Sequence, residues 1–132
     1  MICMLLTMQE QIHIAQNIYH EARGEGRLGW KMVMATTLCR VNSYKYPDSV
    51  YEVIWQRSQF SWTKDGKSDK PKDKKKFQEI LKFVQEQNMD EMLDYRLTNY
   101  HSGEEKPSSW PDHVEYVTRF GGHKFYRDST IY

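Results

Sequence analysis

Residues 18–26, which read Ile-Tyr-His-Glu-Ala-Arg-Gly-Glu-Gly, constrain the fold more than any other stretch. An apolar segment with helical spacing runs into this stretch, and a second helix-patterned segment follows it. Because the glycines end the first helix, Glu21 falls in its last turn, where an acid is unfavourable by roughly a few tenths of a kcal/mol. Glu21 is therefore either an exposed acid or a carboxyl group held in a cleft, as a general acid requires.

The spacing of apolar residues predicts a single domain over residues 1–132, of class α+β and mostly α. Thr7 and Glu10 form one capping-box pattern, and Ser49 and Glu52 form another. The segment 28–42 is the most hydrophobic, and its apolar side chains form one stripe that we expect to face the core. We expect helices over 8–22, 28–42 and 74–87, a short helix from 49 and a helical turn at 90–95. We expect short strands near 98–102, 114–120 and 123–126, with a turn at Gly121-Gly122 between the last two.

Composition excludes some functions. The formal net charge of +1 argues against non-specific nucleic-acid binding, which needs a basic surface. That total hides a basic segment, Lys64–Lys76, which holds seven Lys and three Asp. This segment is either a solvated loop or a surface that attracts an anionic polymer such as a bacterial wall.

Cysteines and the first residues bear on the compartment. Cys3 and Cys39 cannot define a disulfide framework, and Cys39 lies beside an apolar stripe, as a buried inert thiol does. Residues 1–7 are apolar but too short to span a membrane, and they lack the features of a signal peptide. We therefore expect a protein that is made in the cytoplasm without a signal peptide and that does not insert into membranes. We also expect it to be a monomer.

Several chemistries can be tested against the motifs. A zinc-protease motif beginning at His20 and Glu21 would need a second His at position 24, which is Gly24, so we expect no metal and no cofactor. A cysteine amidase would need an exposed thiol at a helix N-terminus, which Cys39 is not. What remains is acid catalysis of glycosidic cleavage by Glu21, beside aromatic and polar residues that gather in 19–26, 59–62 and 100–110.

These motifs resemble one family, the cell-wall hydrolases of the spore-cortex lytic type. The Glu-Ala-Arg-Gly-Glu string at 21–25 is the most specific match, and the order of the matches is preserved from about residue 10 to 126. One departure is that Cys39 precedes Arg40 and Val41, where the family often has Asn. The other matching stretches are 19–20, Gly29, 40–42, 46–54, 59–61, 100–101, Trp110 and 121–126.

The resemblance implies a lysozyme-like fold, with Glu21 as the catalytic acid. It implies peptidoglycan as substrate, cut between N-acetylmuramic acid and N-acetylglucosamine. Many members look like lytic transglycosylases, which need a single acid/base residue, and we favour this reaction. A muramidase-type hydrolase would need a second carboxylate, for which Glu25 is the local candidate; otherwise Glu25 would form a salt bridge with Arg23 or Arg27.

The remaining site residues are predicted to bind substrate. Glu25, Gln59, Ser61, Tyr100 and His101 are expected at the cleft. Three aromatic residues are sugar platforms or, alternatively, core: Phe60, Trp62 and Trp110.

Other interpretations stay open. His123 is expected to be a structural polar residue on its strand rather than a catalyst. An amidase or peptidase, and a catalytically inactive wall-binding module or structural virion component, are the rival functions. The small size and lack of a signal peptide favour a phage endolysin or virion-associated lysin that acts on the bacterial cell wall.

Overall fold

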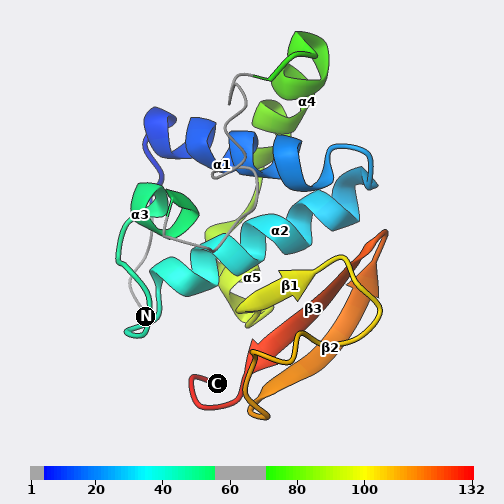
Figure 1. The fold of residues 1–132 in the computed structure, drawn as a ribbon. Helices are drawn as coiled ribbons and strands as arrows, with labels where there is room; N and C mark the ends of the chain where they lie inside the picture. Colours follow the sequence, from blue (N-terminus) through cyan, green and yellow to red (C-terminus); the bar gives the residue numbers. More distant parts are fainter. Residues whose placement is uncertain (1–4, 56–70) are drawn as a thin grey trace.

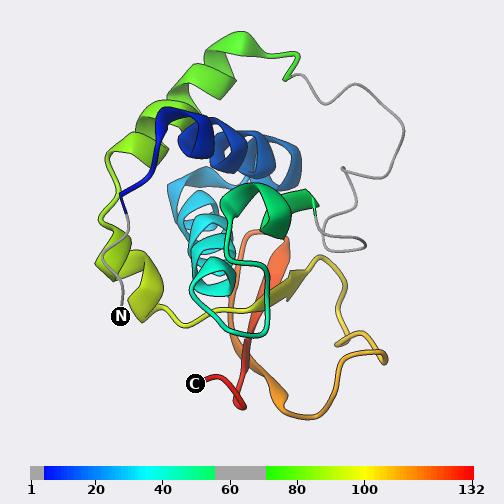
Figure 2. The ribbon, with the colours of Figure 1, turned by 90° about the vertical axis from the view of Figure 1, so that its left-hand side faces the viewer.

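The computed structural model describes residues 5–55 and 71–132, which form a mostly helical α+β fold (Figure 1). The predicted fold class is confirmed. Helix α2 lies between α1 and a small sheet in both ribbon views (Figures 1 and 2). In chain order the elements are α1 (Met8–Ala22), α2 (Gly26–Val41), α3 (Val50–Trp55), α4 (Lys74–Gln85), α5 (Met89–Asp94), β1 (Asn99–His101), β2 (Val114–Phe120) and β3 (His123–Asp128).

Helix α1 begins and ends where its sequence predicts. The Thr7 hydroxyl accepts a hydrogen bond from the backbone N–H of Glu10, and the Glu10 carboxylate accepts one from the N–H of Thr7, which completes the capping box. Ile14, Ile18 and Ala22 follow at helical spacing and are buried. The helix therefore presents one fixed face to the core as far as its last residue, and Glu21 lies in that last turn.

The predicted apolar stripe of α2 faces the core, but most of the other positions of this helix are buried as well. From Gly29 to Arg40, Lys31 is the one position that is not buried. The cause is its central place: α1, α3, α4, α5, β1 and β2 all contact it. The hydroxyls of Thr36 and Thr37 donate to backbone carbonyls four residues earlier, which satisfies these polar groups in the apolar interior.

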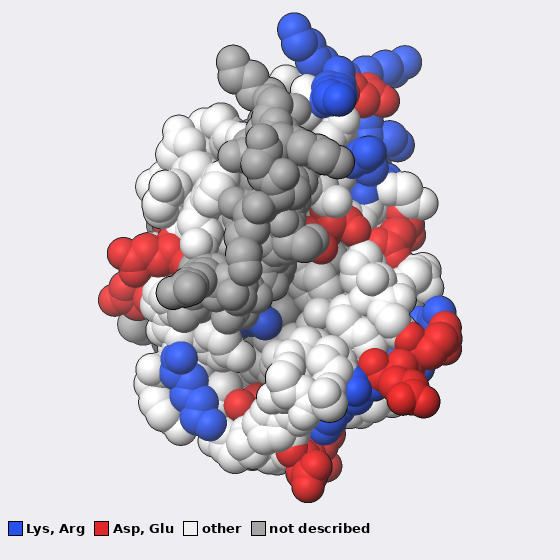
Figure 3. Space-filling view, viewed as in Figure 1, with Lys and Arg blue, Asp and Glu red and all other residues white. Residues whose placement is uncertain are grey.

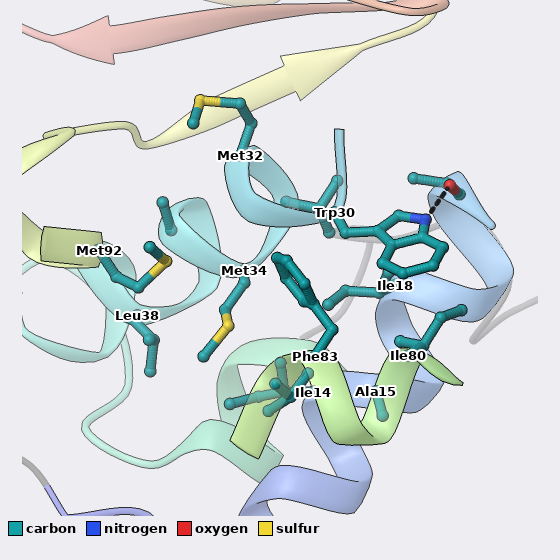
Figure 4. Close-up of a cluster of buried hydrophobic side chains, with 14 of the residues drawn as sticks. Ile14, Ala15, Ile18, Trp30, Met32, Met34, Leu38, Ile80, Phe83 and Met92 are labelled. Atoms are coloured by element: carbon teal, nitrogen blue, oxygen red, sulfur yellow. Dashed lines mark hydrogen bonds between the residues drawn. The ribbon is translucent and has the colours of Figure 1, made fainter. Parts of the chain in front are cut away.

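The main core fills the space between α1, α2 and α4 (Figure 4). Trp30 of α2 packs edge-on against Phe83 of α4, with ring centroids 5.5 Å apart. Its indole Nε1–H donates to the carbonyl oxygen of Ala22 at 3.0 Å, the hydrogen bond dashed in Figure 4. Because that carbonyl belongs to the last residue of α1, Trp30 fixes the end of α1 against the start of α2.

The three strands form an antiparallel sheet in the order β1-β3-β2. Strands β2 and β3 join through a two-residue turn, Gly121-Gly122, as predicted, with Phe120 paired to His123. Gly121 has a φ of +57°, a conformation that glycine adopts without strain. Phe125 is fully buried, and it alternates along β3 with Tyr126, so these two residues mark the inner and outer faces of the sheet.

A buried arginine joins α2 to the sheet. Arg40 is 4% exposed, and its Nε–H donates to the Thr98 carbonyl at 2.6 Å, just before β1. Its guanidinium lies over the ring of Tyr46, 4.9 Å from the centroid. Both ends of α2 are therefore tied to other elements by polar side chains.

Cys39 is fully buried, as predicted, and burial raises the pKa of its thiol, which favours a structural thiol over a reactive one. Cys3 lies outside the described residues. Throughout 5–55 and 71–132, every helix is too short or too polar to cross a membrane.

We predict that Trp30→Phe lowers the free energy of unfolding by about 1–2 kcal/mol, because it removes the hydrogen bond to Ala22 and part of a buried ring. Urea unfolding followed by circular dichroism measures the change. Tyr44→Phe is the control, since Tyr44 is 82% exposed and its replacement should cost less than about 0.5 kcal/mol. Equal stability of the two variants would show that Trp30 does not hold this junction.

Candidate active site

Glu21 has the surroundings of a general acid. Its Oε1 atom is buried and has no hydrogen-bond partner among the described residues. Burial first, and the negative charge of Glu25 second, raise the pKa of Glu21 to about 7. A carboxyl group in this state holds a proton near neutral pH and can also release it.

The end of α1, which carries Glu21, is held from several sides. The guanidinium of Arg23 lies 4.7 Å from the centroid of the Tyr19 ring, and its Nη1–H donates to the Tyr19 carbonyl at 3.2 Å. The Tyr19 hydroxyl accepts a hydrogen bond from the backbone N–H of Asp73, the N-cap of α4, at 2.9 Å. Together with the bond from Trp30, these contacts give Glu21 a rigid support, as a catalytic group needs.

Tyr100 shares this corner of the molecule with Glu21. It lies on β1, on the inner face of the sheet, and its ring packs edge-on against His123 with centroids 5.3 Å apart. Against Phe125 the ring is tilted, with centroids 5.5 Å apart. Burial raises the pKa of the Tyr100 hydroxyl, and the negative charge of Glu21 raises it further. The charge of Glu21 therefore reaches Tyr100, while a role for Tyr100 in binding substrate stays a prediction.

Glu25 makes a contact that the sequence did not reveal. Its Oε1 accepts a hydrogen bond from the backbone N–H of Gly122 at 2.6 Å, and its Oε2 lies 2.6 Å from Nδ1 of His123. The alternative of a salt bridge with Arg23 or Arg27 is wrong, because the carboxylate turns toward the β2–β3 turn instead. Nearly a hundred residues separate Glu25 from its partners, so no local pattern could have found this pairing.

His123 lies between Glu25 and Tyr100, and its structural role stays a prediction. Its side chain is 10% exposed, and the carboxylate of Glu25 on one side and the ring of Tyr100 on the other hold it in place. Its position on β3, directly after the turn, places it on the same inner face as Phe125.

The structure does not bring His101 and Trp110 together with Glu21. Next to Tyr100 on β1, His101 points to the opposite face of the sheet, where its Nε2 lies 2.8 Å from the Tyr126 hydroxyl. Trp110 packs edge-on against both rings, with centroids 5.4 Å from His101 and 5.2 Å from Tyr126. These residues form a cluster on the outer face of the sheet.

Four predicted substrate contacts lie outside the described residues, and so does most of the basic segment Lys64–Lys76. Its described part, residues 71–76, leads into α4, and Lys and Arg side chains gather over the start of α4 at the top of Figure 3. In 5–55 and 71–132, no group of three or more His, Cys, Asp or Glu side chains is placed to hold a metal ion. The four contacts outside are Gln59, Phe60, Ser61 and Trp62.

A hollow of about 550 Å³ lies beside the junction between α1 and α2. It is open to one side and lies between the α1–α2 turn and the start of α4. Arg23, Arg27 and Lys76 give it cationic groups, and Trp30 is among the residues that line it. Lys76 is already paired with Glu79 at 3.0 Å, which reduces the net positive charge of the hollow.

Comparison with known proteins identifies the family. The family model described as cell wall hydrolase matches residues 24–126, most of the chain. A spore cortex-lytic enzyme of Halalkalibacterium halodurans is 30% identical over 112 residues, which are 85% of this chain and 33% of the relative. The chain thus spans about a third of the length of that relative. No solved structure matches the chain, so the lysozyme-like fold stays a prediction.

The matched range contains most of the candidate site. Glu25, Tyr100 and His123 lie inside it, and Glu21 lies three residues before its start. The candidate role of Glu21 therefore depends on its own geometry as well as on the family. On the extent of the match, the chain belongs to the cell wall hydrolase family.

Proposed function

We propose that this protein degrades peptidoglycan by cleaving its glycan strands between N-acetylmuramic acid and N-acetylglucosamine, with Glu21 as the acid. The observation that carries the proposal is the buried Glu21 carboxyl, whose pKa lies near 7 at the end of a firmly held helix. The family described as cell wall hydrolase and the relative named a spore cortex-lytic enzyme support the same substrate.

Glycosidic cleavage makes a specific demand on such a group. The leaving oxygen must receive a proton while positive charge builds on the sugar ring. A carboxyl group with an ordinary pKa is ionised at neutral pH and has no proton to give. The buried carboxyl of Glu21 is partly protonated near pH 7, and after giving its proton it can accept one from the attacking hydroxyl.

We further propose that the reaction is that of a lytic transglycosylase. Glu21 protonates the bridging oxygen as the bond from that oxygen to C1 of N-acetylmuramic acid breaks. The C6 hydroxyl of the same sugar then attacks C1 and closes an anhydro ring, while the Glu21 carboxylate accepts the hydroxyl proton. The proton thus moves from O6 to the leaving oxygen, and no water is consumed.

The contacts of Glu25 support this choice over hydrolysis. A hydrolase needs a second carboxylate that activates water or attacks the sugar. Among the described residues, Glu25 is the acidic neighbour whose charge acts on Glu21, but Gly122 and His123 each occupy one of its oxygens. A muramidase-type hydrolase stays the alternative, and Glu25 would then have to give up these contacts.

The other proposed substrate contacts lie in different parts of the fold. We propose that Tyr100 meets the sugar beside Glu21, because the charge of Glu21 acts on the Tyr100 hydroxyl. A role for His101 and Trp110 would require the glycan to reach the outer face of the sheet. Gln59, Phe60, Ser61 and Trp62 stay proposed contacts from the segment outside the described residues.

We predict that Glu21→Gln reduces the release of soluble glycan from purified peptidoglycan by about 100-fold to 10,000-fold, because the amide cannot donate the proton. Mass spectrometry of the soluble fraction measures the products. Glu86→Gln is the matched control, since Glu86 also ends a helix but is exposed. Release by Glu21→Gln equal to that of the wild type would contradict the assignment of Glu21.

The same products distinguish the two reactions. Muropeptides that end in 1,6-anhydro sugars are expected from the wild type, because the C6 hydroxyl replaces water as the nucleophile. Products with reducing ends would instead make the enzyme a muramidase. Cuts within the peptides alone would overturn the proposed function.

The pKa of Glu21 also predicts the pH dependence. A general acid must be protonated, so kcat/KM should fall as pH rises through about 7, the pKa of Glu21 in the free protein. This fall is the alkaline limb of the pH profile. Initial rates on labelled glycan at constant ionic strength, from pH 5 to 9, measure it. A flat profile across that range would show that Glu21 is not the acid.

Loss of activity in Glu21→Gln should be accompanied by a gain in stability. Because folding raises the pKa of Glu21, the free energy of unfolding of the wild type falls as pH rises from about 4.5 to about 7 and this buried carboxyl ionises. We predict that Glu21→Gln matches the wild type at pH 4 and is more stable at pH 8 by up to about 3 kcal/mol. Urea unfolding at both pH values tests this, and an equal difference at both would contradict a pH-linked origin.

A further inference from the structure

The contact between Glu25 and the β2–β3 turn links two distant parts of the chain. Glu25 is the N-cap residue of α2, four residues after Glu21, and the turn lies close to the C-terminus. In Figure 1 the α1–α2 junction and the tip of the β2–β3 hairpin lie side by side at the right of the molecule. The carboxylate of Glu25 bridges them through Gly122 and His123.

We propose that Glu25 is a positioning residue, which holds the β2–β3 turn, and with it His123 and Tyr100, in place beside Glu21. This inference rests on the proposed function. It gives Glu25 a role other than that of a second catalytic carboxylate or a direct substrate contact.

The first support is that the backbone is shaped to fit this one side chain. A Cβ atom at Gly121 would lie 2.5 Å from Oε1 of Glu25, and one at Gly29 would lie 2.9 Å from its Cβ. Both distances are too short for non-bonded atoms. Glycine at both positions is therefore what allows the turn and the first residues of α2 to close around Glu25.

A second support is the order of contacts that leads from Glu25 through His123 to Tyr100. His123 Nδ1 lies 2.6 Å from Glu25 Oε2, and the ring of His123 packs edge-on against Tyr100. The side chains of His123 and Glu25 are only 10% and 17% exposed, so water competes little for this contact. If Glu25 moved, His123 would lose the contact that holds it in place, and Tyr100 would lose a ring that packs against its own.

Charge gives Glu25 a second effect on the site, in addition to its contacts. Its negative charge helps to raise the pKa of Glu21, after burial, which is the larger cause. Tyr100 from β1, the buried Arg40 from α2 and His123 from β3 are ionisable groups at this corner. The charge of Arg40 lowers the pKa of Tyr100, and those of Glu21 and Glu25 raise it. Neutralising Glu25 should therefore lower the pKa of Glu21 toward its ordinary value.

The central test compares Glu25→Gln with the wild type by titration, without substrate. Carbon-13 NMR follows the side-chain carboxyl of Glu21, whose signal is assigned by its loss in Glu21→Gln. We expect the titration midpoint of Glu21 to move to lower pH in Glu25→Gln. Because no peptidoglycan is present, this measurement tests the contact even if the proposed cleavage reaction is wrong.

Kinetics on glycan form the second part of the test. We expect Glu25→Gln to lower kcat by about 10-fold or more with a smaller change in KM, since misplacing groups near the reacting bond is costly. The alkaline limb of its pH profile should move to lower pH, together with the midpoint measured by NMR. A residue that merely stabilises the fold would not move either of these.

Variants of His123 separate positioning from charge. His123→Asn keeps a polar group close to the place of Nδ1 and should retain most of the activity. His123→Leu removes that polar group but leaves the charge of Glu25, so kcat should fall without a move of the alkaline limb to lower pH. If His123→Leu is as active as the wild type, the positioning role is wrong.

An acid in the connection between β1 and β2, which contacts the same hairpin, supplies the matched control. Glu104 pairs with Arg119 of β2 at 3.3 Å, but its side chain is 77% exposed. Glu104→Gln should leave kcat, KM and the titration of Glu21 unchanged. If the titration midpoint and the alkaline limb of Glu25→Gln both coincide with those of the wild type, the inference is overturned, whatever products the wild type releases.

Discussion

The hydrogen bond from the Trp30 indole to the last carbonyl of α1 is the contact on which this structure depends. It sets where α1 stops and α2 starts, and those two positions decide where Glu21 and Glu25 point. A helix end normally leaves its carbonyls to water or to a cap. Here a core tryptophan satisfies one of them, so the junction belongs to the packed interior and is not a loose surface turn.

Burial of this junction explains why one carboxyl group has unusual acidity. Glu21 follows Tyr19 and precedes Ala22, both of which are buried, so its side chain cannot reach bulk water freely. A carboxylate in such a place is costly, and the group keeps its proton instead. The same tight packing that holds the side chain in position therefore also gives it the proton that a general acid needs.

The sequence predicted the parts of this fold that local rules govern. Capping residues, apolar spacing and the Gly121-Gly122 turn define α1, α4 and the β2–β3 hairpin, because each signal lies within a few residues of its effect. The burial of α2 on all sides was missed, since its cause is the number of elements around it. Polar positions on α2 such as Thr36 look solvent-facing until those neighbours are known.

The candidate site shows the same division between local and distant effects. Glu21 could be found because its place near glycines at a helix end is odd on its own. His101 was grouped with Tyr100 because they are adjacent, although adjacent residues of a strand face opposite ways. Predicting the partner of Glu25 would have required knowing that the β2–β3 turn returns to the α1–α2 junction, which is a property of the topology.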